Sequence, residues 1–202
     1  ICERIDNSSD FNEDDTKNKI INYLIRKLGW DIYENVKFEY PISTTHSANP
    51  IHVDYMLQVS GENCIAIEAK RQDKNLSDKF RGDISTYMME SGVEIGVLTN
   101  GVKAEIYVKS NTMGSSNYIE PLDSFYLKNC SKNLIVMNVL LREVFKKGDQ
   151  REKIDKVKKS RTNFQKPELR EGLEESIKQE INEHIQLSDE DINLHDPINK
   201  II

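Results

Sequence analysis

A carboxylate and an ammonium stand two positions apart in an otherwise apolar stretch, CIAIEAKRQ at residues 64–72, where they belong to Glu68 and Lys70. Side chains two positions apart on a β-strand point to the same face, so these groups end one face of the strand together. A second carboxylate, Asp54, lies in an alternating segment shortly before it. Two carboxylates and a nearby backbone carbonyl suit a hard divalent cation such as Mg²⁺, and a lysine beside them can orient or deprotonate an attacking water. This set favours phosphodiester hydrolysis over acyl transfer, because the sequence shows no GxSxG motif and no Cys–His pairing.

These three groups meet only if two predicted strands pair in the correct register. The segment HVDYMLQV at residues 52–59 alternates strictly, and its apolar face consists of Val53, Tyr55, Leu57 and Val59. A Ser-Gly-Glu-Asn turn follows, so residues 52–70 are predicted to form an antiparallel hairpin. Asp54 then lies beside Glu68 and Lys70 only when the numbers of paired residues sum to an even value, as when Asp54 is opposite Glu68 or Lys70. A slip of one residue would separate the groups.

A purely structural interpretation of the same residues is also open. Carboxylate and lysine pairs occur at strand ends as ordinary salt bridges, and 31% of the residues in this sequence are charged. An Asp and a Glu-x-Lys on neighbouring strands can coincide by chance. Spacing alone therefore leaves both interpretations in place.

The surrounding pattern predicts a mixed α/β fold. Helical spacing of apolar residues, acidic residues in the first turn and a stop at Gly29 indicate a first helix at 13–28. The other expected elements, in chain order, are an extended segment at 32–42 closed by Pro41, a polar loop at 43–50, the hairpin, a second helix around 76–88, strands at 93–100 and 104–108, a Ser/Asn-rich loop at 110–117 and a packed helix at 133–145. Beyond residue 146 the chain is highly charged, which indicates two exposed helices interrupted near Pro167. This order of elements predicts a sheet with helices packed on it.

Four segments together resemble a known family. Asp54 in VDY and Glu68-Ala69-Lys70 in IEAK resemble the PD-(D/E)XK nuclease superfamily. NEDDTKNKIINYLIRKLGWD, VDYML, IAIEAKRQ and GVEIGVLTNGVKAEIYV look like the N-terminal nuclease domain of type I restriction enzyme R subunits, over about residues 11–108. The resemblance implies a restriction-endonuclease-like α/β domain with a mixed central sheet flanked by helices. We assign that domain to residues 1–145 and a charged helical extension to residues 146–202.

The resemblance also implies roles for individual residues. Asp54 and Glu68 are expected to bind Mg²⁺, or Mn²⁺ in its place, with assistance from the carbonyl of Ala69. Lys70 is expected to be the catalytic lysine. Glu13 matches the acidic residue of the family's first helix and is expected to reach the same metal centre as a catalytic and metal-binding residue.

Other positions are candidates for contact with the substrate. Related nucleases carry Gln-x-x-x-Tyr on the helix after the Glu-x-Lys strand; here Tyr87 is retained, but Asp83 stands where Gln is expected. An added carboxylate near phosphate would either repel the substrate or add a metal ligand. The proline that names the superfamily is replaced by Val53. His52 is a candidate phosphate contact or a plain polar strand residue, and Lys103 is either a phosphate contact or a solvated turn residue.

We therefore predict a Mg²⁺-dependent deoxyribonuclease related to restriction-modification. The alternatives are a catalytically weak nucleic-acid-binding or assembly module, and a structural domain that docks a motor subunit through its C-terminal helices. The net charge is -6, but residues 142–166 contain ten Lys/Arg against four Asp/Glu and are the best candidates for DNA contacts, while residues 167–202 contain three against ten. The sequence contains no GxxxxGK[ST] motif and therefore gives no indication of an ATPase motor. Expected partners are DNA and a motor or specificity subunit, and the C-terminal helices can support oligomers.

Composition also predicts the compartment. No run of apolar residues is long enough to span a membrane and no signal peptide is recognisable, so we expect a cytoplasmic protein without membrane association. Cys2, Cys64 and Cys130 are odd in number and widely spaced, and we expect reduced thiols. The chain does not begin with Met, so its first residue is expected to be a processed or trimmed start of something longer.

Overall fold

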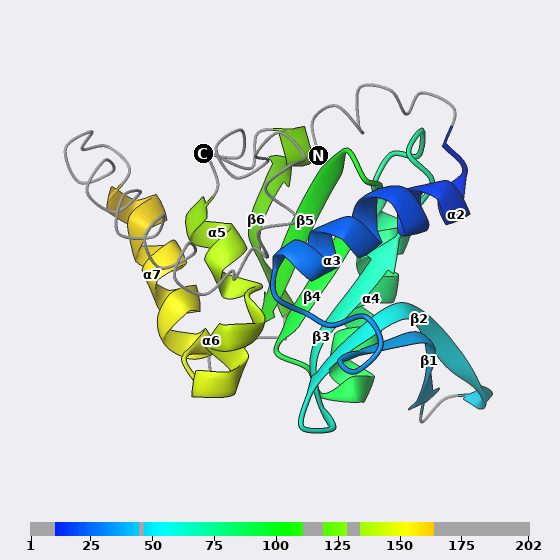
Figure 1. The fold of residues 1–202 in the computed structure, drawn as a ribbon, viewed down its shortest axis with the longest axis horizontal. Helices are drawn as coiled ribbons and strands as arrows, with labels where there is room; N and C mark the ends of the chain where they lie inside the picture. Colours follow the sequence, from blue (N-terminus) through cyan, green and yellow to red (C-terminus); the bar gives the residue numbers. More distant parts are fainter. Residues whose placement is uncertain (1–10, 45–46, 111–118, 129–133, 164–202) are drawn as a thin grey trace.

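The computed structural model describes residues 11–44, 47–110, 119–128 and 134–163, which form a six-stranded sheet in the order β1-β2-β3-β4-β5-β6 (Figure 1). The strands are Val36–Thr44 (β1), Ser47–Val59 (β2), Glu62–Ala69 (β3), Ile95–Thr99 (β4), Lys103–Lys109 (β5) and Ile119–Tyr126 (β6). β3 and β4 pair in parallel, whereas the other neighbouring strands of this sheet pair antiparallel. The expected fold class, a mixed sheet flanked by helices, is confirmed.

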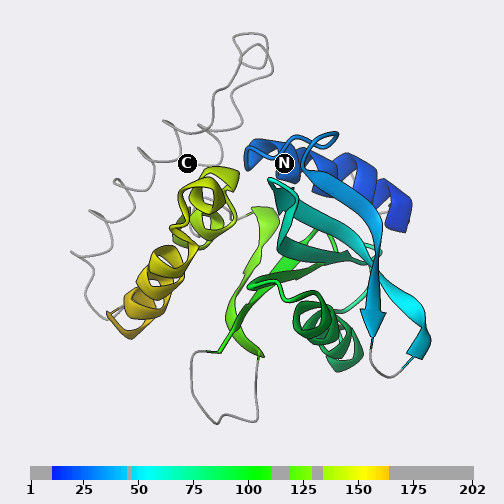
Figure 2. The same cartoon turned by 90° about the horizontal axis from the view of Figure 1, so that it is seen from below.

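Helices cover both faces of the sheet (Figure 2). α4 (Asp78–Ser91) connects β3 to β4 and covers one face, where Met56, Ile84 and Met88 belong to a smaller buried core. The other face carries a larger core beneath the remaining helices, which are α2 (Glu13–Asp15), η1 (Thr16–Ile21), α3 (Asn22–Lys27), α5 (Leu134–Val139), α6 (Arg142–Lys147) and α7 (Gln150–Asn163). We call the continuous run of α2, η1 and α3 the first helix.

The first helix follows the sequence prediction to within one residue but contains a π-helical segment that the pattern did not predict. The side chain of Asn12 accepts a hydrogen bond from the backbone N–H of Asp15 and caps its start. Within η1 the backbone N–H of Asn22 donates to the carbonyl of Lys17, five residues earlier. π-helical segments are rare and frequently occur at functional sites. Lys17 lies within this π-helical segment.

Gly101 allows the first helix to lie close to the turn between β4 and β5. A Cβ atom at this position would meet Thr16 Cγ2 at 2.8 Å and Ile20 Cδ1 at 3.1 Å. The residue also has a φ of +78°, which side chains rarely adopt. Steric and conformational constraints thus both require glycine here.

The prediction of a polar loop at residues 43–50 is wrong. β1 continues to Thr44 and β2 begins at Ser47, so these two strands form a long antiparallel hairpin. Pro41 lies within β1, opposite His52, and does not close the segment. Proline is tolerated there because β1 is an edge strand of the sheet and can leave one backbone group without a partner.

The strict alternation predicted along residues 52–59 breaks at Asp54. Tyr55 and Leu57 lie in the larger core, as expected, but Val53 lies in the smaller core on the opposite face. The neighbouring strand is irregular at the same level, since Glu39 of β1 has a φ of +45°. Because both strands are locally distorted, side chains two positions apart across Asp54, such as Val53 and Tyr55, point to opposite faces of the sheet.

Two features near the C-terminal side were not predicted as they occur. β6 was missed altogether, and the helix expected at 133–145 is divided into α5 and α6. The break frees the carbonyl of Leu140, which accepts a hydrogen bond of 2.8 Å from the indole Nε1 of Trp30. The backbone N–H of Arg142 donates to the carbonyl of Leu28. These two bonds join the end of the first helix to the α5–α6 connection.

The beginning of the charged extension packs on the domain. α7 is not a fully exposed helix, because its Ile154 and Val157 are buried in the larger core. The second helix expected near Pro167 lies outside the described residues, as do Cys2 and Cys130; Cys64 has a free thiol. The domain boundary at 145 stays a prediction. None of the described helices is long and apolar enough to span a membrane.

Candidate active site

The hairpin of β2 and β3 has the register that the chemistry requires. Tyr55 pairs with Ile67 and Met56 with Ala66, and this register continued by one residue sets Asp54 at the level of Glu68. Asp54 Oδ2 accepts a hydrogen bond of 2.6 Å from the backbone N–H of Ala69. The shift in pairing between Leu57 and Gln58 lies toward the turn and does not affect this end of the hairpin. The two carboxylates therefore converge where β2 and β3 separate.

Glu68 and Lys70 form a close, largely buried pair. Lys70 Nζ donates to Glu68 Oε1 at 2.5 Å and lies 5.0 Å from the centre of the Phe80 ring. Glu68 is only 5% exposed, and its second oxygen, Oε2, is buried without a hydrogen-bond partner among the described residues. A buried carboxylate oxygen with no donor is costly unless another group, such as a cation, satisfies it.

Burial dominates the ionisation of this pair. It raises the pKa of Glu68 to about 7, and the negative charge of Asp54 adds to the rise, while Lys70 offsets only part of it. Burial alone would lower the pKa of Lys70, but the hydrogen bond to Glu68 and the charges of Glu68, Asp54 and Glu13 raise it. Lys70 is therefore protonated whenever Glu68 is ionised beside it.

The structure adds a lysine that sequence reasoning missed. Lys17, in η1, donates to Asp54 Oδ1 at 2.5 Å and to Glu39 Oε1 at 3.3 Å, and its Nζ lies 3.5 Å from Glu13 Oε1. Its position four residues after Glu13 is typical of a surface ion pair. Lys17 follows the buried Thr16 at the edge of the apolar stripe of the helix, and this position could have indicated that its side chain lies close to the sheet.

Glu39 was also missed, although it lies opposite Asp54 on the neighbouring strand. Phe38 pairs with Tyr55 and Tyr40 with Val53, which leaves Glu39 at the level of Asp54. A positive φ outside glycine costs on the order of 1–3 kcal/mol and is found mainly at functional sites. Extending the predicted pairing from the hairpin to KFEYPI would have identified it. We call Glu13, Glu39, Asp54 and Glu68 the acidic cluster.

Tyr87 and Asp83 both lie on α4, which follows β3 in the chain. Burial raises the pKa of Tyr87, and the carboxylates of Glu68, Asp83, Asp54 and Glu39 raise it further, in that order. Asp83 is one helical turn before Tyr87 on α4 and is half-buried.

The two remaining substrate candidates lie in other surroundings. His52 is exposed on β2 opposite Pro41, beyond the distortion at Asp54. Lys103 Nζ donates to Glu105 Oε1 at 2.8 Å. Glu105 also accepts two hydrogen bonds of 2.9 Å from Arg81 and one of 2.7 Å from Tyr107. The hydrogen bonds from Arg81 are the main cause that lowers the pKa of Glu105 to about 2. Lys103 is thus part of an ion-pair network that ties α4 to β5.

Asn100 fixes the segment that follows Lys70. Its side-chain amide donates to the carbonyls of Gln72 and Lys74, at 3.2 and 2.9 Å. The backbone N–H of Lys70 itself donates to the carbonyl of Thr99 at 2.7 Å. The end of β4 therefore holds the backbone of Lys70 and of the segment that follows it.

The donor set fits a divalent cation that keeps part of its water shell. Within the described ranges, no three His, Cys, Asp or Glu side chains are arranged to hold a metal by themselves. Mg²⁺ needs less, since one or two carboxylates suffice when water and phosphate complete the coordination. Asp54 and Glu68 offer two, with one buried oxygen lacking a donor. The acidic cluster carries four carboxylates against the ammonium groups of Lys17 and Lys70, which leaves negative charge for a cation to balance.

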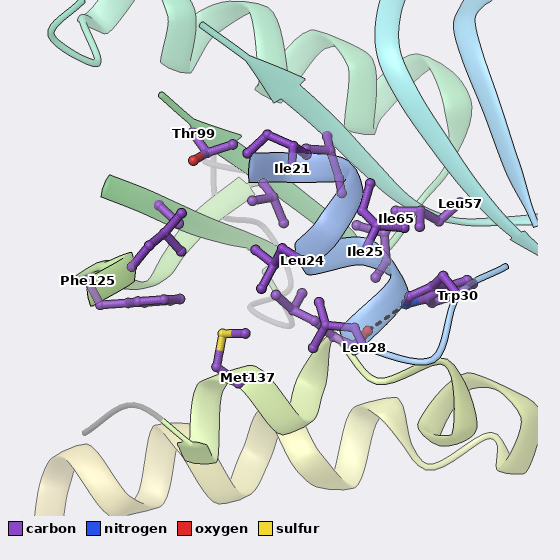
Figure 3. Close-up of a pocket in the computed structure, with 15 residues that line it drawn as sticks. Ile21, Leu24, Ile25, Leu28, Trp30, Leu57, Ile65, Thr99, Phe125 and Met137 are labelled. Carbon is purple, nitrogen blue, oxygen red and sulfur yellow. Dashed lines mark hydrogen bonds between the residues drawn. The ribbon is translucent and has the colours of Figure 1, made fainter. Parts of the chain in front are cut away.

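An interior cavity of about 30 Å³ lies away from this chemistry. Figure 3 shows it between the first helix, the sheet and α5, with Leu24, Ile25, Phe125 and Met137 among its apolar walls. Its polar wall residue Thr99 already donates to the carbonyl of Lys103. The cavity is therefore a packing feature of the larger core and not a part of the candidate site.

Comparison with known proteins gives a family. Searches among curated proteins and among solved structures found no significant match. The family model described as type I restriction enzyme R protein N terminus matches residues 12–125, more than half of the chain. This range contains the first helix, the sheet almost to the end of β6, and every residue of the acidic cluster. The chain therefore belongs to the family of type I restriction enzyme R protein N termini.

Proposed function

We propose that this chain is a Mg²⁺-dependent deoxyribonuclease domain of the PD-(D/E)XK type, acting in a restriction system. The observation that carries the proposal is the meeting of Asp54, Glu68 and Lys70 where β2 and β3 separate, with a buried Glu68 oxygen left without a donor. The family match supports the connection to restriction. Cytoplasmic location follows from such a role and is part of the proposal.

In this proposal Asp54 and Glu68 hold Mg²⁺, or Mn²⁺, together with the carbonyl of Ala69. The bound cation supplies Lewis-acid activation of water and stabilises negative charge on a phosphodiester. Lys70 orients the attacking water and stabilises charge on the phosphate, since its ammonium lies next to Glu68. Tyr87, on α4, is proposed to contact the scissile phosphate.

DNA binding by this chain alone is expected to be weak. Several basic side chains of α6 and α7 already pair with carboxylates of the same chain, namely Lys146 with Glu143, Arg151 with Glu94, Lys156 with Glu152 and Lys158 with Glu120. Affinity for DNA rests largely on basic groups that release counterions from phosphate. We therefore propose that a motor or specificity subunit supplies most of the DNA affinity.

The decisive experiment measures cleavage of supercoiled and linear DNA in Mg²⁺ or Mn²⁺. The parent is expected to nick or cut both, while Lys70→Ala loses at least about 100-fold in rate, the range expected for loss of a positioned acid, base or charge stabiliser. Lys74→Ala is the matched control, because it removes the same charge from an exposed position four residues later. Equal cleavage by the parent and Lys70→Ala would contradict the proposal.

A second candidate is a catalytically weak nucleic-acid-binding or assembly module. It is favoured by one observation, that Asp54 and Glu68 each already have an ammonium partner. Calorimetric titration with Mg²⁺ and Mn²⁺ separates the candidates: the nuclease binds a cation that Asp54→Ala does not, whereas a parent that binds neither cation favours the module.

Docking of a partner subunit through the C-terminal segment is tested by truncation. The cut belongs after Asn163, because a cut after Lys147 would remove the buried Ile154 and Val157 from the larger core. Loss of a restriction partner with unchanged cleavage would assign residues 164–202 to assembly.

A further inference from the structure

Lys17 contacts carboxylates whose exposure differs sharply. The Asp54 side chain is 9% exposed, whereas those of Glu13 and Glu39 are 43% and 65% exposed. The shortest of the three contacts is to the buried one, Asp54. An ammonium within 3.5 Å of three carboxylates can shift among them by a small rotation of its side chain.

The two oxygens of Asp54 accept hydrogen bonds from different donors. Asp54 Oδ2 is held by the backbone N–H of Ala69. Oδ1 remains, and its partner is Lys17. A divalent cation that binds Asp54 through Oδ1 lies directly beside this ammonium, and the repulsion between the two positive charges favours displacement of Lys17.

The backbone around Lys17 and Glu39 supports such an exchange. Lys17 lies in the π-helical segment, and its stem is largely buried between the first helix and the sheet, so its ammonium cannot leave the cluster freely. Glu39 is held near it by the irregular backbone of β1, with a φ of +45°. An exposed carboxylate is thus kept beside the lysine at a conformational cost.

We propose that Lys17 is an exchangeable internal counter-cation, which neutralises Asp54 before a divalent cation binds and moves to Glu39 and Glu13 when one does. This inference rests on the proposed function, because it concerns the same cation site. Lys17 thereby sets the metal affinity, and Glu39 acts as a positioning residue that receives the displaced ammonium.

Calorimetric titration with Mn²⁺ and Mg²⁺ tests the exchange without reference to cleavage. Lys17→Met keeps the length of the side chain and removes the competing charge, so it is expected to bind about 10- to 100-fold more tightly than the parent, as when a charge-assisted hydrogen bond no longer has to be broken. Lys19→Met is the control, since Lys19 lies on the same helix but pairs with Asp15. Equal or weaker binding by Lys17→Met would overturn the proposal.

A double-mutant cycle separates the positioning role of Glu39 from a direct one. Glu39→Gln is expected to weaken cation binding several-fold in the parent but to have little effect in the Lys17→Met background, because no ammonium then needs a receiving site. An equal loss in both backgrounds would make Glu39 a direct ligand and overturn the exchange.

A chemical measurement keeps the proposal testable if Lys17→Met does not fold. Modification of Lys17 by an amine acetylating reagent, read by mass spectrometry in the unaltered chain, is expected to accelerate in Mn²⁺, because the amino group leaves the buried Asp54 and becomes more accessible to the reagent. Unchanged or slower modification of Lys17, while the parent binds Mn²⁺ in calorimetry, overturns the exchange alone. A parent that binds neither cation overturns the proposed function as well.

Discussion

Ionisation of Glu68 is expected to make the protein less stable as the pH rises, and Glu68→Gln should remove that effect. Burial and the charge of Asp54 raise the pKa of Glu68 from 4.5 to about 7 in the folded protein. The unfolded chain returns this pKa to its ordinary value. The carboxyl group is thus easier to ionise in the unfolded state, and ionisation favours unfolding.

The sign and size follow from proton linkage. Below the unfolded pKa, Glu68 is protonated in both states and has no penalty. Between the two pKa values the unfolded state loses its proton first, so the free energy of unfolding falls as pH rises; above the folded pKa the full penalty is present. A difference between 4.5 and about 7 corresponds to roughly 3 kcal/mol, at 1.36 kcal/mol for each pKa unit.

The assay is urea denaturation of the parent and Glu68→Gln across pH 4 to 8 without divalent cations. The glutamine also removes the ion pair with Lys70, but the favourable effect of that pair is already included in the raised pKa of Glu68. The change in the difference between the two curves, about 3 kcal/mol in favour of the variant toward high pH, therefore isolates the carboxyl group. Glu62→Gln, at an exposed position on the same strand, is the control. A difference that stays constant with pH would refute the argument from burial.

Three further predictions concern the frame around the site. Glu105→Gln should lower the free energy of unfolding by about 1–3 kcal/mol near neutral pH, because it leaves Arg81 with a weaker partner, and the loss should fade as pH falls from about 4.5 toward 2, which urea titrations at pH 7 and pH 3 measure. Gly101→Ala should cost about 1–3 kcal/mol from its clash with the first helix, whereas Gly61→Ala should cost only about 1 kcal/mol, because Gly61 has a similar positive φ but no neighbour within 4 Å. Thermal denaturation compares the two variants, and equal losses would contradict the steric argument. Ile154→Ala should cost about 2–5 kcal/mol in chemical denaturation, and a loss below 1 kcal/mol would mean that α7 does not share the larger core.

The features of the site that could be predicted from sequence are those that produce a local sequence pattern. Alternation in residues 52–59 and a short turn restrict the pairing of β2 with β3, so the sequence limits the registers in which Asp54 shares a face with Glu68 and Lys70. The first helix carries its own cap, acidic first turn and apolar stripe. Each of these signals spans fewer than about 20 residues, which is why periodicity detects them.

The missed features depend on tertiary contacts. From sequence, Lys17 is expected to form a surface ion pair with Glu13. Its contact with Asp54 depends on the π-helical segment and on the close packing of the first helix against Gly101, neither of which the sequence pattern predicts. The exchange of faces at Asp54 arises from the backbone of Glu39 on another strand. β6 contains Pro121 and buries Leu122 and Phe125, an interval of three that breaks the strand period, so no alternation marks it.

The hydrogen bond from Trp30 to the carbonyl of Leu140 joins positions 110 residues apart. During synthesis, the larger core around the first helix cannot be completed until the chain beyond α5 has left the ribosome. The smaller core beneath α4 consists of residues that all precede position 120, so it can form earlier. A nascent chain halted near residue 125 should therefore expose the apolar side of its first helix, which would make that interval the one in which chaperone protection matters most.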